Sequence, residues 1–502
     1  MHRSEFFSNE CAVWLGIDLG TQSVRAMAVS GAGAVVGLGV QPLASHRDGV
    51  RHEQEPEDWW TATAAACRAA LRDLSQHAVR GVAVDATSGT ILLVNDAGRA
   101  LTRGLMYDDT RAAAEVARVN ETGGAVWSRL GYRRMQAAWG LPKLMWLLRE
   151  RRELVTSTSR LAHQSDFITR RLAGAPVATD TSNALKTGCD LFAEEWPRDV
   201  FEALDISPAI LPPVVRSGSR LGGVCPSAAA ETGIPAGTSI VAGMTDGCAA
   251  QIGAGALLEG SWNSVLGTTL VLKGVTPGLI HDPLGVVYSH RSPDGHWLPG
   301  GASSVGAGIL AVRFPRTDLD ALSAQAATLG PAGAVAYPLA GRGERFPFHS
   351  PDAEGFVLGE PRDDIDHSAA ILQGVGFVER LCFDYLDLLG APVGSDLRLT
   401  GGGAKSRAWC QLRANILGRP VMIPESAEAA LGMAVLAAAD GRSLSETAAA
   451  MVRIRETLDP QPERARVFDE PYLRLVDELA RREWLDQSVA AHARNRVASA
   501  LA

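Results

Sequence analysis

Two short turns combine residue types suited to binding phosphate. Leu-Gly-Thr occurs at residues 19–21, within GIDLGTQSVRAMAV, and again at 266–268, within NSVLGTTLVLKGV, almost half of the 502-residue chain further on. A tight turn of glycine and hydroxyl residues directs backbone N–H groups toward one point and can hold phosphate oxygens without net positive charge. Either turn alone could be an ordinary hairpin. Equivalent placement in two halves favours phosphate binding by Thr21 and by Gly267, Thr268 and Thr269.

A carboxylate stands directly before the first of these turns. Asp18 ends an apolar run and precedes Leu-Gly-Thr. A carboxylate beside a phosphate-binding turn is electrostatically unfavourable unless a cation lies between them, and Mg²⁺ takes oxygen ligands while keeping several waters. The alternative is an aspartate that caps the turn. The sequence DLGT, which joins both features, favours a metal-associated role.

A second carboxylate has unusually small neighbours. Asp246 lies in GMTDGCAAQIGAG, after the apolar run SIVAG. Glycines and alanines beside it leave the carboxylate reachable by a substrate, so it could accept a proton from a hydroxyl group that attacks. Asp246 could instead cap the helix that follows, and the residues alone leave both interpretations open.

Other polar segments could bind a nucleotide or a hydroxylated ligand. TGGGAKS (400–406) is a glycine-rich loop between a predicted strand and a predicted helix, where nucleotide backbone could approach closely. It matches neither the GxxxxGK[ST] nor the GxGxxG spacing. DATSGT (85–90) and MYDDTR (106–111) bring short polar side chains to probable strand ends, as a hydroxylated ligand requires. These two segments could equally be polar loops.

The elements that must position these residues repeat in the two halves. Residues 13–17, 23–30 and 34–43 read as three strands, 56–74 as a helix with Pro56 near its first turn, and 79–87 as a buried strand. The second half offers strands at 261–266, 268–275 and 284–290, a long helix at 367–390, and a strand at 396–400. Helices are predicted at 405–418, 428–439 and 471–490. We place the domain boundary between residues 257 and 258.

Bulk composition excludes some classes of protein. Hydrophobic content of 46% with 21% charged residues indicates a globular protein long enough for two domains. The net charge of −8, without a long run of like charge, argues against nucleic acid or a membrane surface as a partner. The first ten residues lack the apolar core of a signal peptide, and no 18-residue apolar span occurs, so a cytoplasmic location is expected.

Taken together, the motifs resemble the FGGY family of carbohydrate kinases over nearly the full chain. The resemblance rests on GIDLGTQSVRA, EQEPEDWW, SDFITRRLAG, GMTDGCAAQIGAG, GTT, YPLAGRGERFPF, GGGAKSRAWCQLRANILGRPV and EAALGMAVLAA, in that order. It implies an α/β fold of two actin-like, ribonuclease-H-like ATPase domains facing across a cleft. Residues 1–257 would carry the sugar side and the catalytic aspartate, and residues 258–502 the nucleotide side.

The resemblance also implies roles for particular residues. Asp246 matches the catalytic base, and Asp18, Ser88 and Asp246 match positions that contact the sugar. Asp18 and Asp246 would also associate with Mg²⁺, partly through water. The ATP contacts would be Thr21, Gly267, Thr268, Thr269, Gly402, Gly403 and Ala404. The expected cofactors are therefore ATP and Mg²⁺, the partner is a small sugar, and a homodimer is common among similar proteins.

The choice of sugar depends on a segment that departs from common members. Xylulose kinases typically carry Gln-Met-His-Gly near 87–90, and glycerol kinases carry Asn-Gln-Arg-Glu-Thr, whereas this chain has DATSGT. An Asp-x-Thr-Ser segment is similar to that of ribulose-phosphorylating members, so D-ribulose is favoured over D-xylulose or another polyol or sugar acid. Two non-kinase readings stay open, an actin-like ATPase and a silent sugar-binding relative. A nicotinamide-dependent enzyme fails on glycine spacing.

Overall fold

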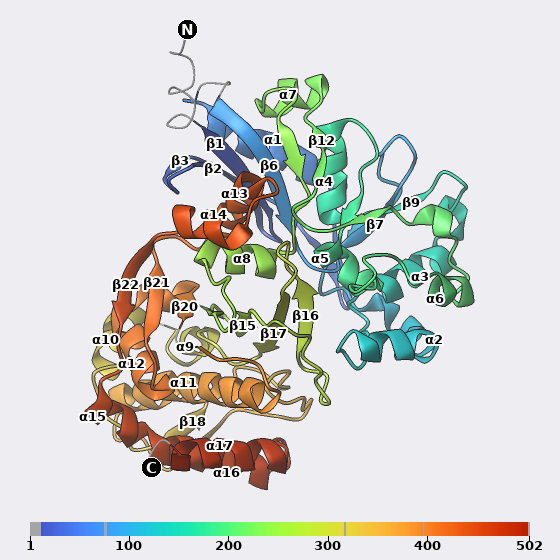
Figure 1. Ribbon diagram of the computed structural model, residues 1–502. Coiled ribbons are helices and arrows are strands. Elements are labelled where there is room, and N and C mark those ends of the chain that lie inside the picture. Colours follow the sequence, from blue (N-terminus) through green and yellow to red (C-terminus); the bar gives the residue numbers. More distant parts are fainter. Residues whose placement is uncertain (1–11, 75–77, 316–317, 395, 500–502) are drawn as a thin grey trace. The chain divides into compact units, whose positions relative to one another are not determined.

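The protein divides into two compact units. The computed structural model describes residues 12–74, 78–315, 318–394 and 396–499 (Figure 1). Unit 1 takes the described chain up to Gly255 together with His290–Trp297 and Ser426–Arg453. Unit 2 takes Ala256–Ser289, Leu298–Glu425 and the described chain from Ile454 onward. Unlike the predicted split into 1–257 and 258–502, these units are not continuous, because two later segments belong to unit 1.

Unit 1 contains a six-stranded and a five-stranded sheet with helices around them. Its strands are β1 (Val13–Leu19), β2 (Ser23–Ser30), β3 (Val35–Pro42), β4 (His46–Asp48), β5 (Arg51–Gln54), β6 (Val79–Ala86), β7 (Ile91–Val94), β8 (Gly104–Leu105), β9 (Arg160–His163), β10 (Thr179–Asp180), β11 (Val214–Val215), β12 (Arg220–Gly223) and β13 (Ser239–Val241). Its helices are α1 (Pro56–Leu71), α2 (Val116–Arg129), α3 (Gly140–Glu150), α4 (Gln164–Ala173), α5 (Thr181–Ala184), α6 (Arg198–Ala203), α7 (Pro226–Thr232), α8 (Asp246–Ala254), α13 (Ala429–Ala439) and α14 (Leu444–Met451).

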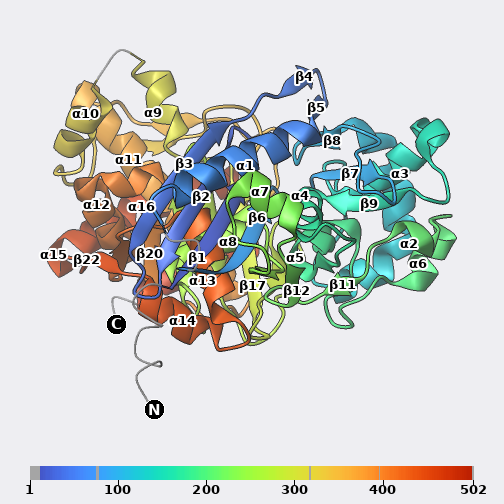
Figure 2. The same ribbon diagram turned by 90° about the horizontal axis from the view of Figure 1, so that it is seen from above.

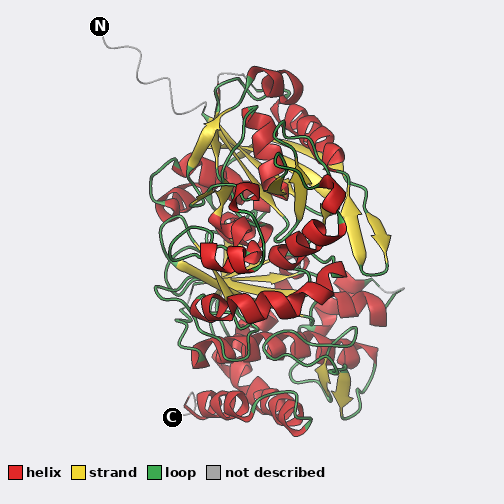
Figure 3. Cartoon of the chain, turned by 90° about the vertical axis from the view of Figure 1, so that its right-hand side faces the viewer, coloured by secondary structure: helices red, strands yellow, loops and turns green. Residues whose placement is uncertain are grey.

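Unit 2 is built on a seven-stranded sheet. The last residues of its strand β16 belong to the segment His290–Trp297, which is assigned to unit 1. The strands are β14 (Trp262–Leu266), β15 (Leu270–Gly274), β16 (Tyr288–Arg291), β17 (Trp297–Ser303), β20 (Leu397–Thr400), β21 (Val421–Pro424) and β22 (Ile454–Leu458), with a separate pair β18 (Val335–Tyr337) and β19 (Phe356–Leu358). The helices are α9 (Gly308–Arg313), α10 (Leu319–Ala326), α11 (Asp364–Leu388), α12 (Arg407–Leu417), α15 (Pro462–Ala465), α16 (Asp469–Arg481) and α17 (Gln487–Ser499). Figure 3 shows helices flanking the strands.

The two large sheets share one topology. In unit 1, β1 pairs antiparallel with β2 and β2 with β3, while β1 pairs parallel with β6 and β6 with β13. In unit 2, β14 pairs antiparallel with β15 and β15 with β17, while β14 pairs parallel with β20 and β20 with β21. Each sheet therefore has the same five-strand core, and each Leu-Gly-Thr turn joins the first strand of its core to the second.

Glycines let two helices approach opposite faces of the unit 1 sheet. Helix α1 lies along β2 and β3 (Figure 2), and a Cβ on Gly39 would lie 2.0 Å from the carbonyl oxygen of Ala66. Helix α13 packs on β1 and β6, and a Cβ on Gly16 would lie 1.7 Å from the carbonyl oxygen of Ala430. Gly39 pairs with Ala26 and Gly16 with the adjacent Met27, so the two glycines face opposite sides. The close approach of α13 explains why residues 426–453 belong to unit 1.

The tail differs from the single helix predicted at 471–490. Helix α16 ends at Arg481 and α17 begins at Gln487. Between them Glu483 has a φ of 60°, a left-handed conformation that does not continue a helix. The predicted apolar stripe is nevertheless buried, with Tyr472 and Leu475 fully covered. Among the described residues, no helix is long and apolar enough to cross a membrane.

Candidate active site

Three carboxyl groups meet at one end of the unit 1 sheet. Asp18 near the end of β1 is the register partner of Asp85 near the end of β6. The next residue, Ala86, forms a parallel bridge with Thr245, so Asp246 follows immediately beside them as the first residue of α8. Because the carboxyl ends of parallel strands share one edge, Asp18 and Asp246 lie close together although 228 residues separate them in sequence.

The electrostatics of this cluster follow from burial and like charge. Burial, with the carboxylates of Asp18 and Asp246 as further causes, raises the pKa of Asp85 well above its usual range. Burial and then Asp246 raise the pKa of Asp18 to about 6, against the opposing effect of Arg25. The two oxygens of Asp85 accept no hydrogen bond from other donors in the described chain. Burial without a hydrogen-bond donor favours the protonated form of the Asp85 carboxyl.

Neither predicted aspartate is the N-cap residue of a helix. The N-cap residue of α8 is Thr245, and Asp246 accepts a hydrogen bond from the adjacent Gly247 N–H at 2.7 Å. Asp246 is partly exposed at the N-terminal end of α8. Within the described residues, no backbone N–H donates to the Asp18 carboxylate. Both groups are thus placed for a ligand.

The cluster suits a cation that keeps part of its water shell. Two partly exposed carboxylates, Asp18 and Asp246, share one strand edge, and their repulsion contributes to the raised pKa of Asp18. No group of three or more His, Cys, Asp or Glu side chains forms a metal-binding cluster in the described part of the chain. Mg²⁺ commonly binds through one or two carboxylates with water and substrate phosphate as the remaining ligands. The residues present fit that pattern.

A buried glutamine forms a hydrogen bond to the first Leu-Gly-Thr turn. The Gly20 N–H donates to the Ser23 carbonyl at 3.1 Å, which closes the turn. Gln54 Nε2 donates to the Thr21 carbonyl at 2.6 Å, and Gln54 Oε1 accepts from Trp59 Nε1 at 2.7 Å. Gln54 and Trp59 belong to EQEPEDWW. This motif therefore anchors the turn to helix α1.

Ser88 lies beside buried groups with unused hydrogen-bonding capacity. Among the described residues, its buried Oγ has no hydrogen-bond partner, and neither has Nε2 of Gln164, whose Oε1 accepts from the Thr87 hydroxyl at 2.7 Å. Lys143 Nζ donates to the carbonyl of Gly89 at 3.1 Å, and burial lowers the pKa of Lys143 to about 7. These groups surround the DATSGT segment, so it forms a polar site rather than a surface loop.

The two glycine-rich segments of unit 2 meet at the carboxyl end of its central strands. Val265 near the end of β14 pairs with Thr400 at the end of β20. The loop that follows crosses over Leu266: a Cβ on Gly401 would lie 2.7 Å from the Leu266 carbonyl oxygen, and Gly401 has a φ of 79°. A Cβ on Gly403 would lie 2.5 Å from Cδ2 of the Leu266 side chain. The structure thus brings Gly267, Thr268 and Thr269 next to Gly402, Gly403 and Ala404.

A third segment supports the unit 2 turn. The Ala307 N–H donates to the Gly267 carbonyl at 2.9 Å, and the Gly308 N–H donates to the Thr268 carbonyl at 3.2 Å. The carbonyls of the turn are thereby occupied, while Thr268 and Gly402 are exposed. The Gly267 N–H donates to the Thr269 carbonyl at 3.0 Å, so the exposed Thr268 hydroxyl is the donor of this turn that a phosphate could reach.

Sequence reasoning missed several residues of these sites. Asp85 was read only as part of a polar segment, and its place beside Asp18 depends on strand register. Gln164 and Lys143 belong to no motif with its own chemistry: Gln164 begins the mixed helix α4, and Lys143 stands among apolar residues of α3. The supporting segment at 305–308 was not considered.

Comparisons with known proteins concern the family and the fold of the chain. The model of the FGGY family of carbohydrate kinases, N-terminal domain, matches residues 13–253, and that of its C-terminal domain matches residues 263–440. The xylulose kinase of Streptomyces rubiginosus is 31% identical over 465 residues, covering 88% of this chain and 90% of its own. The xylulose kinase of Bacillus subtilis is 27% identical over 474 residues, covering 90% and 94%.

Solved structures share the fold across different named activities. A xylulose kinase from Rhodospirillum rubrum superposes with a TM-score of 0.82 at 25% identity, covering 93% of this chain and 98% of that one. A glycerol kinase from Plasmodium falciparum superposes with a TM-score of 0.83 at 17% identity, covering 95% and 99%. The fold is thus the predicted α/β arrangement of two actin-like domains, and it does not by itself choose the sugar. The chain belongs to the FGGY family of carbohydrate kinases.

Proposed function

We propose that this kinase transfers the γ-phosphoryl group of ATP to a terminal hydroxyl of a ketopentose, with D-xylulose as the first candidate. The observation that carries the proposal is the carboxylate cluster of unit 1, where Asp246 lies partly exposed beside Asp18 at a strand edge. A partly exposed carboxylate that a substrate can reach is able to accept a proton from a hydroxyl group.

Asp246 acts as the general base in this proposal. It accepts the proton of the sugar hydroxyl as the hydroxyl oxygen bonds to the γ-phosphorus, while the bond from that phosphorus to the β,γ-bridging oxygen breaks and ADP leaves. Asp18 and Ser88 hold the sugar together with Asp246, and the buried, unpartnered Ser88 hydroxyl has hydrogen-bonding capacity to do so. Positioning and charge stabilisation supply most of the rate in phosphoryl transfer.

Asp18 and Asp246 would hold Mg²⁺, partly through water. The ion would neutralise charge on the phosphates and offset the repulsion that raises the pKa of Asp18. Thr21 in the first turn, Gly267, Thr268 and Thr269 in the second, and Gly402, Gly403 and Ala404 would contact ATP. The exposed donors of the unit 2 turns support that assignment.

The sequence alone favours D-ribulose, whereas the relatives favour D-xylulose. The relatives above are named xylulose kinases and align over about nine-tenths of the chain. D-Ribulose is the second candidate, because DATSGT stands where common xylulose kinases carry Gln-Met-His-Gly. A polar segment built on Ser88 and Thr87 can serve either ketopentose, so the two sugars must be compared directly.

The test is ADP release from Mg·ATP with D-xylulose, D-ribulose, L-ribulose, L-xylulose, ribitol, glycerol and gluconate, each against a control without sugar. We expect the highest kcat/KM with D-xylulose. A clear preference for D-ribulose would refute the order of the two candidates and keep the ketopentose class. No signal above the control with any ketopentose would refute the class, and sugar binding without ADP release would revive the silent relative.

A further inference from the structure

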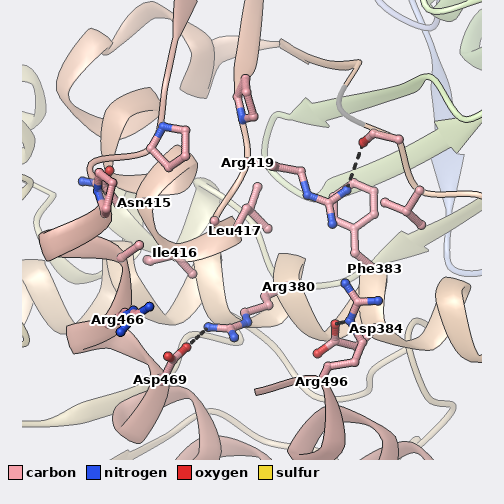
Figure 4. A pocket seen from close by; sticks show the side chains of 17 residues that line it. Arg380, Phe383, Asp384, Asn415, Ile416, Leu417, Arg419, Arg466, Asp469 and Arg496 are labelled. Atoms are coloured by element: carbon pink, nitrogen blue, oxygen red, sulfur yellow. Dashed lines mark hydrogen bonds and ion pairs between the residues drawn. The ribbon is translucent and has the colours of Figure 1, made fainter. Parts of the chain in front are cut away.

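A pocket in unit 2 lies away from the turns proposed to bind phosphate. It has a volume of about 610 Å³ and is formed by α11, the C-terminal end of α12, the loops before β20 and β21, and the residues around α15 and α17 (Figure 4). Gly394 precedes β20 and Pro420 precedes β21, whereas residues 401–404 follow β20. The pocket is therefore at the amino-terminal edge of these strands, and the four residues of β20 span roughly 13 Å between the two sites. We call it the arginine pocket.

Positive charge is in excess in this pocket. Its lining includes four arginines, Arg380, Arg419, Arg466 and Arg496, but only two carboxylates, Asp384 and Asp469. Arg380 pairs with Asp469 at 2.8 Å, and Arg496 pairs with Asp384 at 3.1 Å, as Figure 4 shows for the labelled side chains. The other two arginines have no carboxylate partner among the residues that the structure describes. Arg496 also pairs with Asp387 at 2.8 Å, so the four arginines exceed the carboxylates paired with them by one.

Arg419 is held in place but not neutralised. Its guanidinium lies over the Phe383 ring, 5.1 Å from the centroid, and Nη1 donates to the Gly394 carbonyl at 3.4 Å. Burial, followed by the nearby positive charge of Arg496, lowers the pKa of Arg419 against the opposing effect of nearby carboxylates, of which Asp384 is the strongest. An anion in the pocket would give this half-buried arginine charge-assisted hydrogen bonds in addition to its long bond to Gly394.

We propose that the arginine pocket binds a small phosphorylated metabolite, a phosphate monoester, independently of the kinase reaction. A phosphate monoester carries a charge of about −1.5 to −2 at neutral pH, which is opposite in sign to the excess charge of the pocket. Arg419 and Arg466 would bind the phosphoryl group. The apolar side chains of Ile416 and Val393 and the prolines of the rim would contact the organic part. The volume exceeds what inorganic phosphate alone would fill, and it lies in the usual range for small-molecule sites.

Arg466 offers a substitution with a close control. It is exposed, so Arg466→Gln is expected to leave the fold intact. Arg464, two residues earlier, is also exposed but does not line the pocket, so Arg464→Gln makes the same change in net charge outside it. Arg419→Gln is a second variant that removes the half-buried member of the site.

The experiment is calorimetric titration of the full chain with glucose 6-phosphate, glycerol 3-phosphate, inorganic phosphate and glucose, in saturating Mg·ADP so that the nucleotide turns are occupied. We expect a phosphate ester to bind, with affinity roughly tenfold or more weaker in Arg466→Gln and Arg419→Gln and within twofold of the parent in Arg464→Gln. Equal weakening in Arg464→Gln and Arg466→Gln would overturn the proposal, because it would show that binding depends only on the net charge of the protein and not on the pocket. No ester binding, or inorganic phosphate binding as tightly as the esters, would also overturn it. Kinase activity is not part of the readout, so failure here is separate from failure of the proposed function.

Discussion

Replacement of Asp18 by asparagine should make the protein more stable at neutral pH. The Asp18 carboxyl has a pKa raised to about 6 by burial and by Asp246, against a reference value of 3.8. At low pH this carboxyl is protonated in both the folded and the unfolded state, so it does not lower the free energy of unfolding. As the pH rises from about 4 to about 6, the unfolded chain ionises more readily than the folded protein, and the free energy of unfolding falls. Above that range the folded protein carries an unfavourable buried charge, and the loss stays constant.

The size of the effect follows from these two pKa values. At pH 4.5 the ionisation of Asp18 costs about 1 kcal/mol of unfolding free energy, and at pH 7.5 it costs about 3 kcal/mol. Asn cannot ionise, so the stability difference between Asp18→Asn and the parent should grow by about 2 kcal/mol over this range. For a unit of this size, that corresponds to roughly 4–8 °C in the melting temperature of unit 1.

The assay is differential scanning calorimetry of both proteins without ligand, at several pH values from 4.5 to 7.5. Asp48→Asn is the matched control, because Asp48 is an exposed aspartate of unit 1 that lies outside the carboxyl cluster. Its difference from the parent should stay constant with pH. A difference for Asp18→Asn that is equal at pH 4.5 and 7.5 would refute the reasoning, and so would a pH-dependent difference of the same size for Asp48→Asn.

Three further predictions concern the base, the nucleotide loop and the helix interface of unit 1. Asp246→Asn should lower kcat by roughly 10²–10⁴-fold with little change in the melting temperature, and near-normal turnover would remove Asp246 from the role of base. Gly401→Ala should weaken ADP binding and lower the melting temperature of unit 2, because its φ is 79° and its Cβ would meet the backbone of β14. Gly402→Ala, where a Cβ meets nothing within 4 Å, should leave that melting temperature unchanged. Gly16→Ala should destabilise unit 1 by about 1–3 kcal/mol in chemical denaturation, because its Cβ would lie 1.7 Å from a backbone oxygen of α13.

Local sequence patterns predicted the elements of the fold better than their assembly. The alternation at 13–17, 23–30 and 34–43 and the helical spacing after Pro56 correspond to β1, β2, β3 and α1. The short strands β4 and β5 gave no such pattern, because they contain few apolar residues. Periodicity also does not show which sheet a helix covers. The small-residue helix at 428–439 was therefore expected in the second half, whereas it packs in unit 1.

The candidate site shows the same limit at the level of single residues. Asp18, Asp246 and the two glycine-rich turns were recognisable because each lies in a short motif with its own chemistry. Asp85 and Leu266 matter through partners far away in the sequence, Asp18 in one case and Gly401 in the other. Strand register creates both contacts, and a single sequence does not specify the register of parallel strands.

The duplicated topology allows one position to be compared between the two units. Each Leu-Gly-Thr turn follows the penultimate residue of its first strand, which is Asp18 in β1 and Val265 in β14. The register partner of Asp18 is Asp85, and the register partner of Val265 is Thr400. Carboxylates beside the unit 2 turn would repel the phosphates of a nucleotide, whereas an apolar residue and a hydroxyl do not. Carboxylates at the same position in unit 1 can hold a cation and accept a proton. The division of roles that we propose thus corresponds to a chemical difference at one pair of equivalent positions in two otherwise similar sheets.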